Sequence, residues 1–139
     1  NINYDRFIAE IMVPLTADNA VVYRPFLCME QEYDSVVSLK KTGVNVIEGT
    51  YACHPVLREI YAKLTGWEVI TLFMDIDDRN QRDRVRGRVG ELRFKLFEDK
   101  WIPREREYFS AYSVREYCDY SISGMDDSIL FLREDGNEA

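Results

Sequence analysis

The hydrophobic positions near the N-terminus repeat with the period of an α-helix. Apolar or aromatic side chains stand at positions 4, 7, 8, 11 and 12, which places them on one face of a helix over residues 3–13. Asn3 directly precedes this run and is expected to cap the helix. Pro14 is expected to end it, because proline disfavours the helical conformation of the residue before it.

Short apolar runs farther along the chain predict β-strands. They cover residues 20–23, 36–39, 44–47, 69–74 and 120–123. The run 44–47 is apolar except for Asn45, and a continuous rather than alternating pattern is typical of a parallel strand that is buried on both faces. The run 69–74 is the richest in β-branched and aromatic residues, so it is the strongest strand prediction in the chain.

Helical patterns separate these strands. One helix is expected to begin at Pro55 and to end at Thr65-Gly66, a second to cover residues 78–88 with Asp77 as its N-cap, and a third to cover residues 90–112 with an interruption at Pro103. Because strands alternate with helices, the sequence predicts an α/β fold, with a parallel sheet, flanking helices and right-handed crossovers.

Composition narrows the classes of protein. The 139 residues are 46% hydrophobic, so we expect a single domain over residues 1–139, with residues 133–139 as a disordered tail. A formal net charge of −7 argues against an overall nucleic-acid-binding surface and against a basic protein that binds a membrane surface. The three cysteines are odd in number and widely spaced, and the sequence shows no signal peptide and no apolar run of membrane length. These features favour a cytoplasmic protein with reduced thiols. No cysteine or histidine pair has the spacing of zinc ligands.

The end of the run 44–47 is the first candidate site. Glu48-Gly49 follows this strand directly, at the edge of an α/β sheet where ligands are usually bound. The Glu48 carboxylate could bind Mg²⁺ or its water ligands, and Gly49 would let the backbone turn close to a ligand. The alternative is an ordinary strand end followed by a turn.

A cluster of arginines is the second candidate site. Five of them fall within ten residues, at positions 79, 82, 84, 86 and 88. On a helix, Arg84 and Arg88 share one face, and Arg82 and Arg86 share another. The planar guanidinium group suits phosphate, although the same residues would also suit a solvated helix face balanced by neighbouring aspartates.

An aromatic segment and the only histidine complete the candidates. Tyr23-Arg24-Pro25-Phe26 places rings beside an arginine, which could stack on a base and bond its edge, or could simply pack around a loop proline. His54 could serve as a base or contact a substrate, but a histidine before a proline more often packs at the start of a helix.

The ordered set of these segments resembles the uridine kinase-like family of P-loop nucleoside kinases. The resemblance covers about residues 2–123. The matching segments are Asn3-Tyr4-Asp5-Arg6-Phe7, Tyr23-Arg24-Pro25-Phe26, Val46-Ile47-Glu48-Gly49-Thr50-Tyr51 with His54-Pro55, Leu72-Phe73-Met74-Asp75-Ile76-Asp77, then Gln81, Arg84, Arg88 and Gly90, Trp101-Ile102-Pro103 with Glu105 and Tyr108-Phe109, and Cys118-Asp119.

The resemblance implies a three-layer α/β architecture and transfer of the ATP γ-phosphoryl group to a nucleoside 5′-hydroxyl. By similarity, Arg84 and Arg88 are the catalytic arginines of a lid over the phosphates. Tyr23, Arg24, Phe26 and His54 would bind the nucleoside. Glu48 would bind Mg²⁺ beside ATP. Nucleoside and ATP are the expected partners, with no nucleic acid and no membrane.

One part of the family pattern does not occur in these residues. Family members begin with a strand, a Gly-x-x-x-x-Gly-Lys-Ser/Thr loop and a helix, followed by a strand that carries a catalytic Asp. The chain contains seven glycines but no Gly-Lys-Ser or Gly-Lys-Thr. We therefore expect a fold that is incomplete at its N-terminus, no ATP turnover by this chain alone, and strand edges that self-association into a homo-oligomer could cover.

Two other functions remain open. The chain could be a non-catalytic nucleoside-binding or regulatory domain that keeps only the nucleoside-side and lid elements. It could also belong to a phosphotransferase that acts on another small alcohol, such as a sugar or a vitamin-like alcohol, because one scaffold hosts many functions.

Overall fold

The computed structural model describes residues 2–17, 19–28, 30–124 and 130–133. The chain forms two compact units, which are described separately. The first comprises residues Asn1–Ala52 and Glu59–Thr65, and the second comprises Cys53–Arg58 and Gly66–Ala139. The predicted tail falls largely on residues 134–139, outside the described part of the chain.

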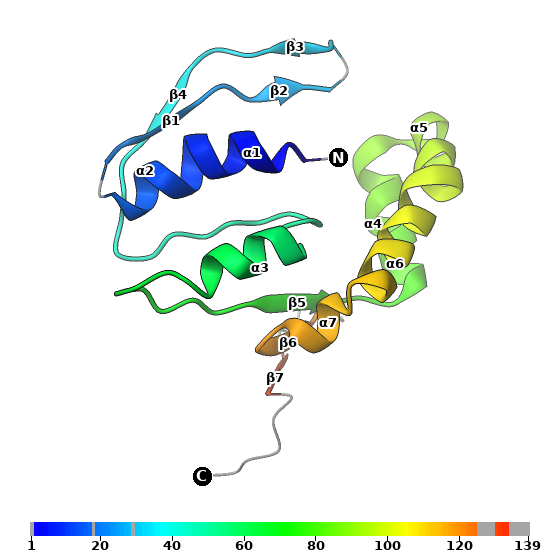
Figure 1. The fold of residues 1–139 in the computed structure, drawn as a ribbon. Helices are drawn as coiled ribbons and strands as arrows, with labels where there is room; N and C mark the ends of the chain where they lie inside the picture. The colour runs from blue at the N-terminus through cyan, green and yellow to red at the C-terminus, as the bar shows by residue number, and fades with distance from the viewer. Residues whose placement is uncertain (1, 18, 29, 125–129, 134–139) are drawn as a thin grey trace. The chain divides into compact units, whose positions relative to one another are not determined.

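The first unit begins with a helix that is longer than the sequence predicts. It consists of α1 (Tyr4–Phe7), a π-helical turn (Ile8–Met12) and α2 (Val13–Thr16) (Figure 1). Asn3 caps it as expected, since its side-chain oxygen accepts a hydrogen bond from the Arg6 N–H at 3.1 Å. The prediction that Pro14 ends the helix is wrong. The wide π-helical turn lies just before Pro14, where the proline cannot donate the usual bond to residue i−4.

Two antiparallel strand pairs follow this helix. β1 (Val21–Tyr23) pairs with β4 (Val37–Leu39), and β2 (Phe26–Leu27) pairs with β3 (Glu32–Tyr33). They form one two-stranded arm (Figure 1), whose register shifts by one residue between the two pairs. β1 contacts the π-helical turn, and Met12, Leu15 and Val21 form the buried core of this unit. The strands predicted at residues 20–23 and 36–39 are therefore confirmed.

The buried parallel strand predicted at residues 44–47 does not form. Val44 is 80% exposed and Val46 is 84% exposed, and the segment has no strand geometry. Asn45 instead closes a local turn, in which its amide donates to the Thr42 carbonyl at 2.9 Å. A strand needs at least one neighbour to pair with, and no described strand pairs with this segment.

The second unit is built on a sheet of β5 (Leu72–Asp75), β6 (Tyr120–Ser123) and β7 (Leu130–Arg133), in that order. β5 and β6 are parallel, whereas β6 and β7 are antiparallel. The mixed α/β class is thus confirmed. The extended parallel sheet is not, because β5–β6 is the one parallel pair among the described residues.

Helices make up the rest of the second unit. α3 (Pro55–Tyr61) begins at Pro55 as predicted, although it ends before Thr65, and its last residues belong to the first unit. α4 (Asp78–Val89) is followed by α5 (Glu91–Leu96), a π-helical turn (Phe97–Trp101), α6 (Ile102–Ala111) and α7 (Val114–Tyr117) (Figure 1). Pro103 again follows a π-helical turn without ending the helix.

Side-chain contacts fix these helices in place. Asp77 caps α4 by accepting a hydrogen bond from the Asn80 N–H at 2.8 Å. Arg106 on α6 pairs with Asp78 at 2.5 Å, and Gln81 donates to Glu105 at 2.5 Å, so two bonds join α4 to α6. Leu57, Phe94, Ile102, Val114 and Ile122 are all buried. No described helix is long and apolar enough to cross a membrane.

Candidate functional site

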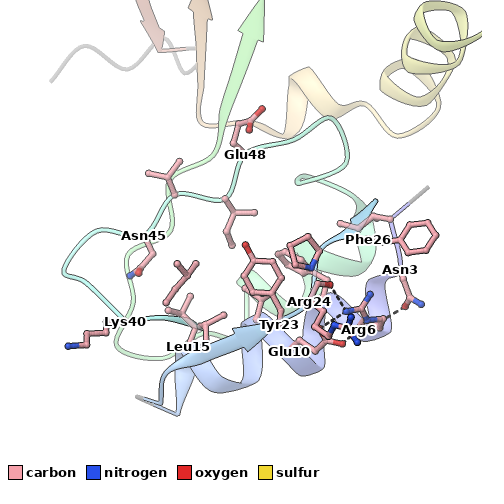
Figure 2. A pocket seen from close by; sticks show the side chains of 18 of the residues that line it. Asn3, Arg6, Glu10, Leu15, Tyr23, Arg24, Phe26, Lys40, Asn45 and Glu48 are labelled. Atoms are coloured by element: carbon pink, nitrogen blue, oxygen red, sulfur yellow. Dashed lines mark hydrogen bonds and ion pairs between the residues drawn. The ribbon is translucent and has the colours of Figure 1, made fainter. Parts of the chain in front are cut away.

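A pocket of about 930 Å³ opens in the first unit. The N-terminal helix, the strand arm and the segment 39–48 line it (Figure 2). Apolar side chains such as Phe7, Leu15 and Val21 form much of the wall, and Tyr23, Arg24, Phe26 and Glu48 are also among the lining residues. The structure therefore brings together four of the seven residues that the sequence assigned to a site.

Hydrogen bonds of Arg6 hold one wall of the pocket in place. Arg6 Nε and Nη2 donate to the two oxygens of Glu10 at 2.6 and 2.7 Å, and Nη2 also donates to the Arg24 carbonyl at 3.0 Å. Its guanidinium lies 4.6 Å from the centre of the Tyr33 ring. The hydrogen bond from Arg6 lowers the pKa of Glu10, and the same bond raises the pKa of Arg6. Helix and arm are thus joined at one end of the pocket (Figure 2).

Arg24 has a structural task in this arm. Its Nε donates to the Asp34 carbonyl at 2.8 Å, and its Nη2 donates to the Tyr33 carbonyl at 2.9 Å. Arg24 stands where the register of the arm shifts, so its planar fork bonds carbonyls that the strand ladder does not use. The predicted base-edge contact would require the side chain to give up these bonds.

Two aromatic rings remain available to a ligand. Tyr23, on β1, points its ring into the pocket (Figure 2). Phe26 is 44% exposed and packs edge-on against Tyr33, with ring centres 5.3 Å apart. Because Phe26 is partly exposed, its ring can stack on a planar ligand.

Glu48 lies at the rim away from Arg6 and Glu10 (Figure 2). It is exposed and forms no ion pair or hydrogen bond with the residues that the structure describes. Gly49 follows with a φ of +151°, a conformation that L side chains rarely adopt, although nothing lies within 4 Å of where its Cβ would be. A free carboxylate followed by a turn fits the expected metal-binding position, as a single ligand.

The two predicted catalytic arginines lie in the second unit on α4. Arg84 Nη2 donates to the Gly124 carbonyl at 2.7 Å, just past the end of β6, where the Gly124 N–H bonds to the Asp75 carbonyl at the end of β5. Arg84 therefore lies at the carboxyl edge of the parallel strand pair, the usual ligand edge of such sheets. Arg88 is exposed and forms no ion pair or hydrogen bond with any described residue.

The neighbouring arginines are engaged with acidic side chains. Arg82 pairs with Glu98, and Arg86 pairs with Asp83 at 3.3 Å and with Glu91 at 3.0 Å. Arg86 also covers the Phe94 ring at 4.3 Å. These contacts join α4 to the helices that follow, so Arg82 and Arg86 are less free than Arg88 to meet a phosphate.

His54 is packed in the second unit among aromatic rings. It stacks on Tyr108 with ring centres 6.1 Å apart and meets Tyr112 edge-on at 4.9 Å. Its Nδ1 accepts a hydrogen bond from the Val56 N–H at 3.3 Å, which defines the neutral imidazole with its proton on Nε2. Burial, and then the charge of Arg58, lower the pKa of His54. These contacts suit the packing role at the start of a helix.

Sequence reasoning missed Arg58, which organises the start of α3. Its Nε donates to the Cys53 carbonyl at 2.7 Å, its Nη2 donates to the Tyr112 carbonyl at 2.9 Å, and its guanidinium lies 4.0 Å from the centre of the Tyr117 ring. No pattern in the sequence distinguishes this arginine, because two of the three groups it contacts lie more than 50 residues away.

Comparisons of this chain with family models, curated proteins and solved structures found no match.

Proposed function

We propose that this chain carries the nucleoside-binding and phosphate-binding parts of an ATP-dependent nucleoside kinase of the uridine kinase type, with the three-layer architecture of P-loop nucleoside kinases. The observation that carries the proposal is the pocket of the first unit. Tyr23, Arg24, Phe26 and Glu48 were each assigned from the sequence, and all four line it. Its volume of about 930 Å³ suits a molecule of nucleoside size, and its mixed apolar and polar wall suits a base and a ribose.

Each residue of the pocket has a distinct part in this function. The exposed face of Phe26 stacks on the base, and the Tyr23 ring closes the apolar side of the pocket. Arg24 acts as a positioning residue, since its side chain holds the arm that presents Phe26. Arg6 and Glu10 fix the same arm to the helix, so the pocket is preorganised rather than assembled by the ligand.

The arginines of α4 supply the phosphate-binding part. Arg88 has no competing partner among the described residues, and Arg84 lies at the carboxyl edge of β5 and β6. Guanidinium groups stabilise the charge that spreads over the oxygens of a transferring phosphoryl group. Arg84 would exchange its bond with the Gly124 carbonyl for one with a phosphate oxygen.

Mg²⁺ and ATP fit these residues only in part. Glu48 can supply one carboxylate ligand, and no cluster of three metal-binding side chains occurs among the described residues. Mg²⁺ is usually bound through one or two carboxylates together with substrate phosphates. The loop that would hold the ATP phosphates, and its lysine, do not occur in the sequence, so we assign no residue to that task.

A second candidate is a domain that binds a nucleoside without turnover. Calorimetric titration of this chain with a nucleoside and with ATP–Mg²⁺ tests the nucleoside-binding pocket that both functions require. Nucleoside binding with no ATP binding and no ADP formation supports the proposed part of a kinase and the binding-only domain alike. ADP formation that depends on Arg88 would show that this chain is a kinase by itself. A panel of acceptors would then distinguish nucleosides from other small alcohols.

Variants test the pocket directly. Phe26→Ala should weaken nucleoside binding roughly 5- to 150-fold, because stacking of a base on an aromatic ring is worth about 1–3 kcal/mol. Val22→Ala is the matched control, since Val22 lies on the same strand arm, is 49% exposed and does not line the pocket. Equal affinities in these two variants, or no nucleoside binding by the wild-type chain, would overturn the proposal.

A further inference from the structure

Two cysteines lie next to each other in the second unit, outside the proposed site. Cys53 precedes the start of α3 and Cys118 precedes β6, and 65 positions separate them in the sequence. Their Sγ atoms are 3.8 Å apart, and the Cys118 thiol donates a hydrogen bond to Cys53. A disulfide has an S–S distance of about 2.05 Å, so a shift of less than about 2 Å would join them.

The two thiols differ in access and in charge. Cys118 is 5% exposed, whereas Cys53 is only half-buried and open to a small reagent. The hydrogen bond from Cys118 and the charge of Arg58 lower the pKa of Cys53 to about 7, against the effect of burial, and the same hydrogen bond raises the pKa of Cys118. Cys53, the more exposed thiol and the one with the lowered pKa, is therefore the nucleophile of the pair.

We propose that Cys53 and Cys118 form a site of reversible oxidation, in which hydrogen peroxide converts the pair to an intramolecular disulfide. The Cys53 thiolate attacks one peroxide oxygen, the O–O bond breaks, and Cys53 becomes a sulfenic acid while hydroxide leaves. Cys118 sulfur then attacks the Cys53 sulfur, and the hydroxyl group leaves as water with the thiol proton. The pair loses two electrons, and the peroxide is reduced to two molecules of water.

The disulfide would fasten the start of α3 to the start of β6. At present the Cys53 carbonyl and the Thr71–Asp119 hydrogen bonds hold these two places through separate contacts. A covalent link between residues 65 positions apart also restricts the unfolded chain, so the oxidised protein should melt at a higher temperature than the reduced protein.

The test uses the full chain with Cys28→Ser, which removes the exposed third cysteine of the first unit and leaves the pair intact. Treatment with an equimolar amount of hydrogen peroxide should lower the intact mass by about 2 Da and remove both free thiols. A non-reducing digest should yield one peptide that joins residues 53 and 118. Dithiothreitol should restore the original mass and the original melting temperature.

Two further variants in the same background assign the roles. With Cys118→Ser, Cys53 should stop at the sulfenic acid, which a dimedone probe captures. With Cys53→Ser, Cys118 should react with peroxide at least about tenfold more slowly, because it is buried and remains a thiol. In the chain that keeps both cysteines of the pair, a mass increase on Cys53 without the joined peptide, or a disulfide between chains, would overturn the proposal. Faster reaction of Cys118 than of Cys53 in the single variants would overturn it as well.

Discussion

Replacement of Thr71 by valine tests the contact that joins the two parallel strands. The Thr71 hydroxyl donates to Asp119 Oδ2 at 2.7 Å and accepts from the Asp119 N–H at 3.0 Å, and the Thr71 N–H donates to the same carboxylate at 2.7 Å. Thr71 is 8% exposed, so water does not readily replace these bonds. Thr71→Val keeps the shape of the side chain and removes both hydroxyl bonds, one of them to a charged acceptor.

The structure sets the size of the effect. A hydrogen bond to a charged group contributes about 1.5–3 kcal/mol and a neutral one about 1 kcal/mol, so Thr71→Val should lower the free energy of unfolding by roughly 2–4 kcal/mol. Thr71→Ser is the matched control, since it keeps the hydroxyl and removes one methyl group, at a cost of about 1 kcal/mol. Both variants leave the backbone bond to Asp119 in place.

Urea unfolding followed by tryptophan fluorescence is the appropriate assay. Trp67 and Trp101 both lie in the second unit, so the signal reports on the unit that contains the contact. Asp119→Asn, measured alone and with Thr71→Val, completes a double-mutant cycle and gives the coupling energy of the pair. A cost below about 0.5 kcal/mol for Thr71→Val, or a larger cost for Thr71→Ser, would refute the reasoning.

Three further predictions concern the residues at the starts of α3 and α4. Arg58→Lys keeps the charge, but one lysine cannot donate to the Cys53 and Tyr112 carbonyls together. In urea unfolding it should therefore lose most of the stability that Arg58→Met loses, roughly 2 kcal/mol. Wild-type stability of the lysine variant would contradict the role of Arg58 in bonding both carbonyls. The pKa of His54 is lower in the folded chain than in the unfolded chain. The unfolded chain therefore binds a proton first as the pH falls through about 6.5, and stability decreases below that pH. His54→Phe should flatten this part of the curve of stability against pH, and an unchanged slope would contradict the prediction. Asp77→Ala should reduce helicity and melting temperature more than Asp78→Ala, because Asp77 caps the helix. The hydrogen bonds with Asn80 lower the pKa of Asp77, so this difference should disappear only as the pH falls through that lowered pKa. Equal melting temperatures of the two variants at pH 7 would exclude the cap.

The features that the sequence predicted correctly are mostly local. The caps at Asn3 and Asp77 and the helix start at Pro55 depend on residues within one turn of each other, and all three form as expected. Pro14 was misread for a local reason too. It follows a π-helical turn, and hydrophobic periodicity does not distinguish that turn from an ordinary helical one.

The strand at residues 44–47 failed for a different reason. Its apolar pattern indicates only that the segment would be stable as a strand buried on both faces. The pattern contains no information about whether a partner strand and covering elements are present. Among the described residues none pairs with it, and the segment lines a pocket instead, with Glu48 at the rim. Glu48 was therefore proposed as a ligand from a structural premise that is wrong, because no strand ends there.

Sequence spacing divided the arginines of α4 by helix face, but the structure divides them by partner. Arg82 and Arg86 pair with Glu98 and Glu91, which lie on other elements, whereas Arg88 forms no ion pair or hydrogen bond with any described residue. A helical wheel shows which side chains share a face and cannot show what that face meets. The same limit explains why Arg24, predicted to bind a base edge, proves to bond the carbonyls of its own arm.

The contacts that sequence reasoning missed share one property, a long separation along the chain. Thr71 and Asp119 are 48 positions apart, Arg58 and Tyr112 are 54 apart, and the two neighbouring cysteines are 65 apart. All of them converge where α3, β5 and β6 begin. Cys118 and Asp119 contributed to the resemblance with nucleoside kinases, yet here Asp119 joins two strands and Cys118 contacts a thiol. Substitution of Asp119 should therefore first change stability rather than ligand binding.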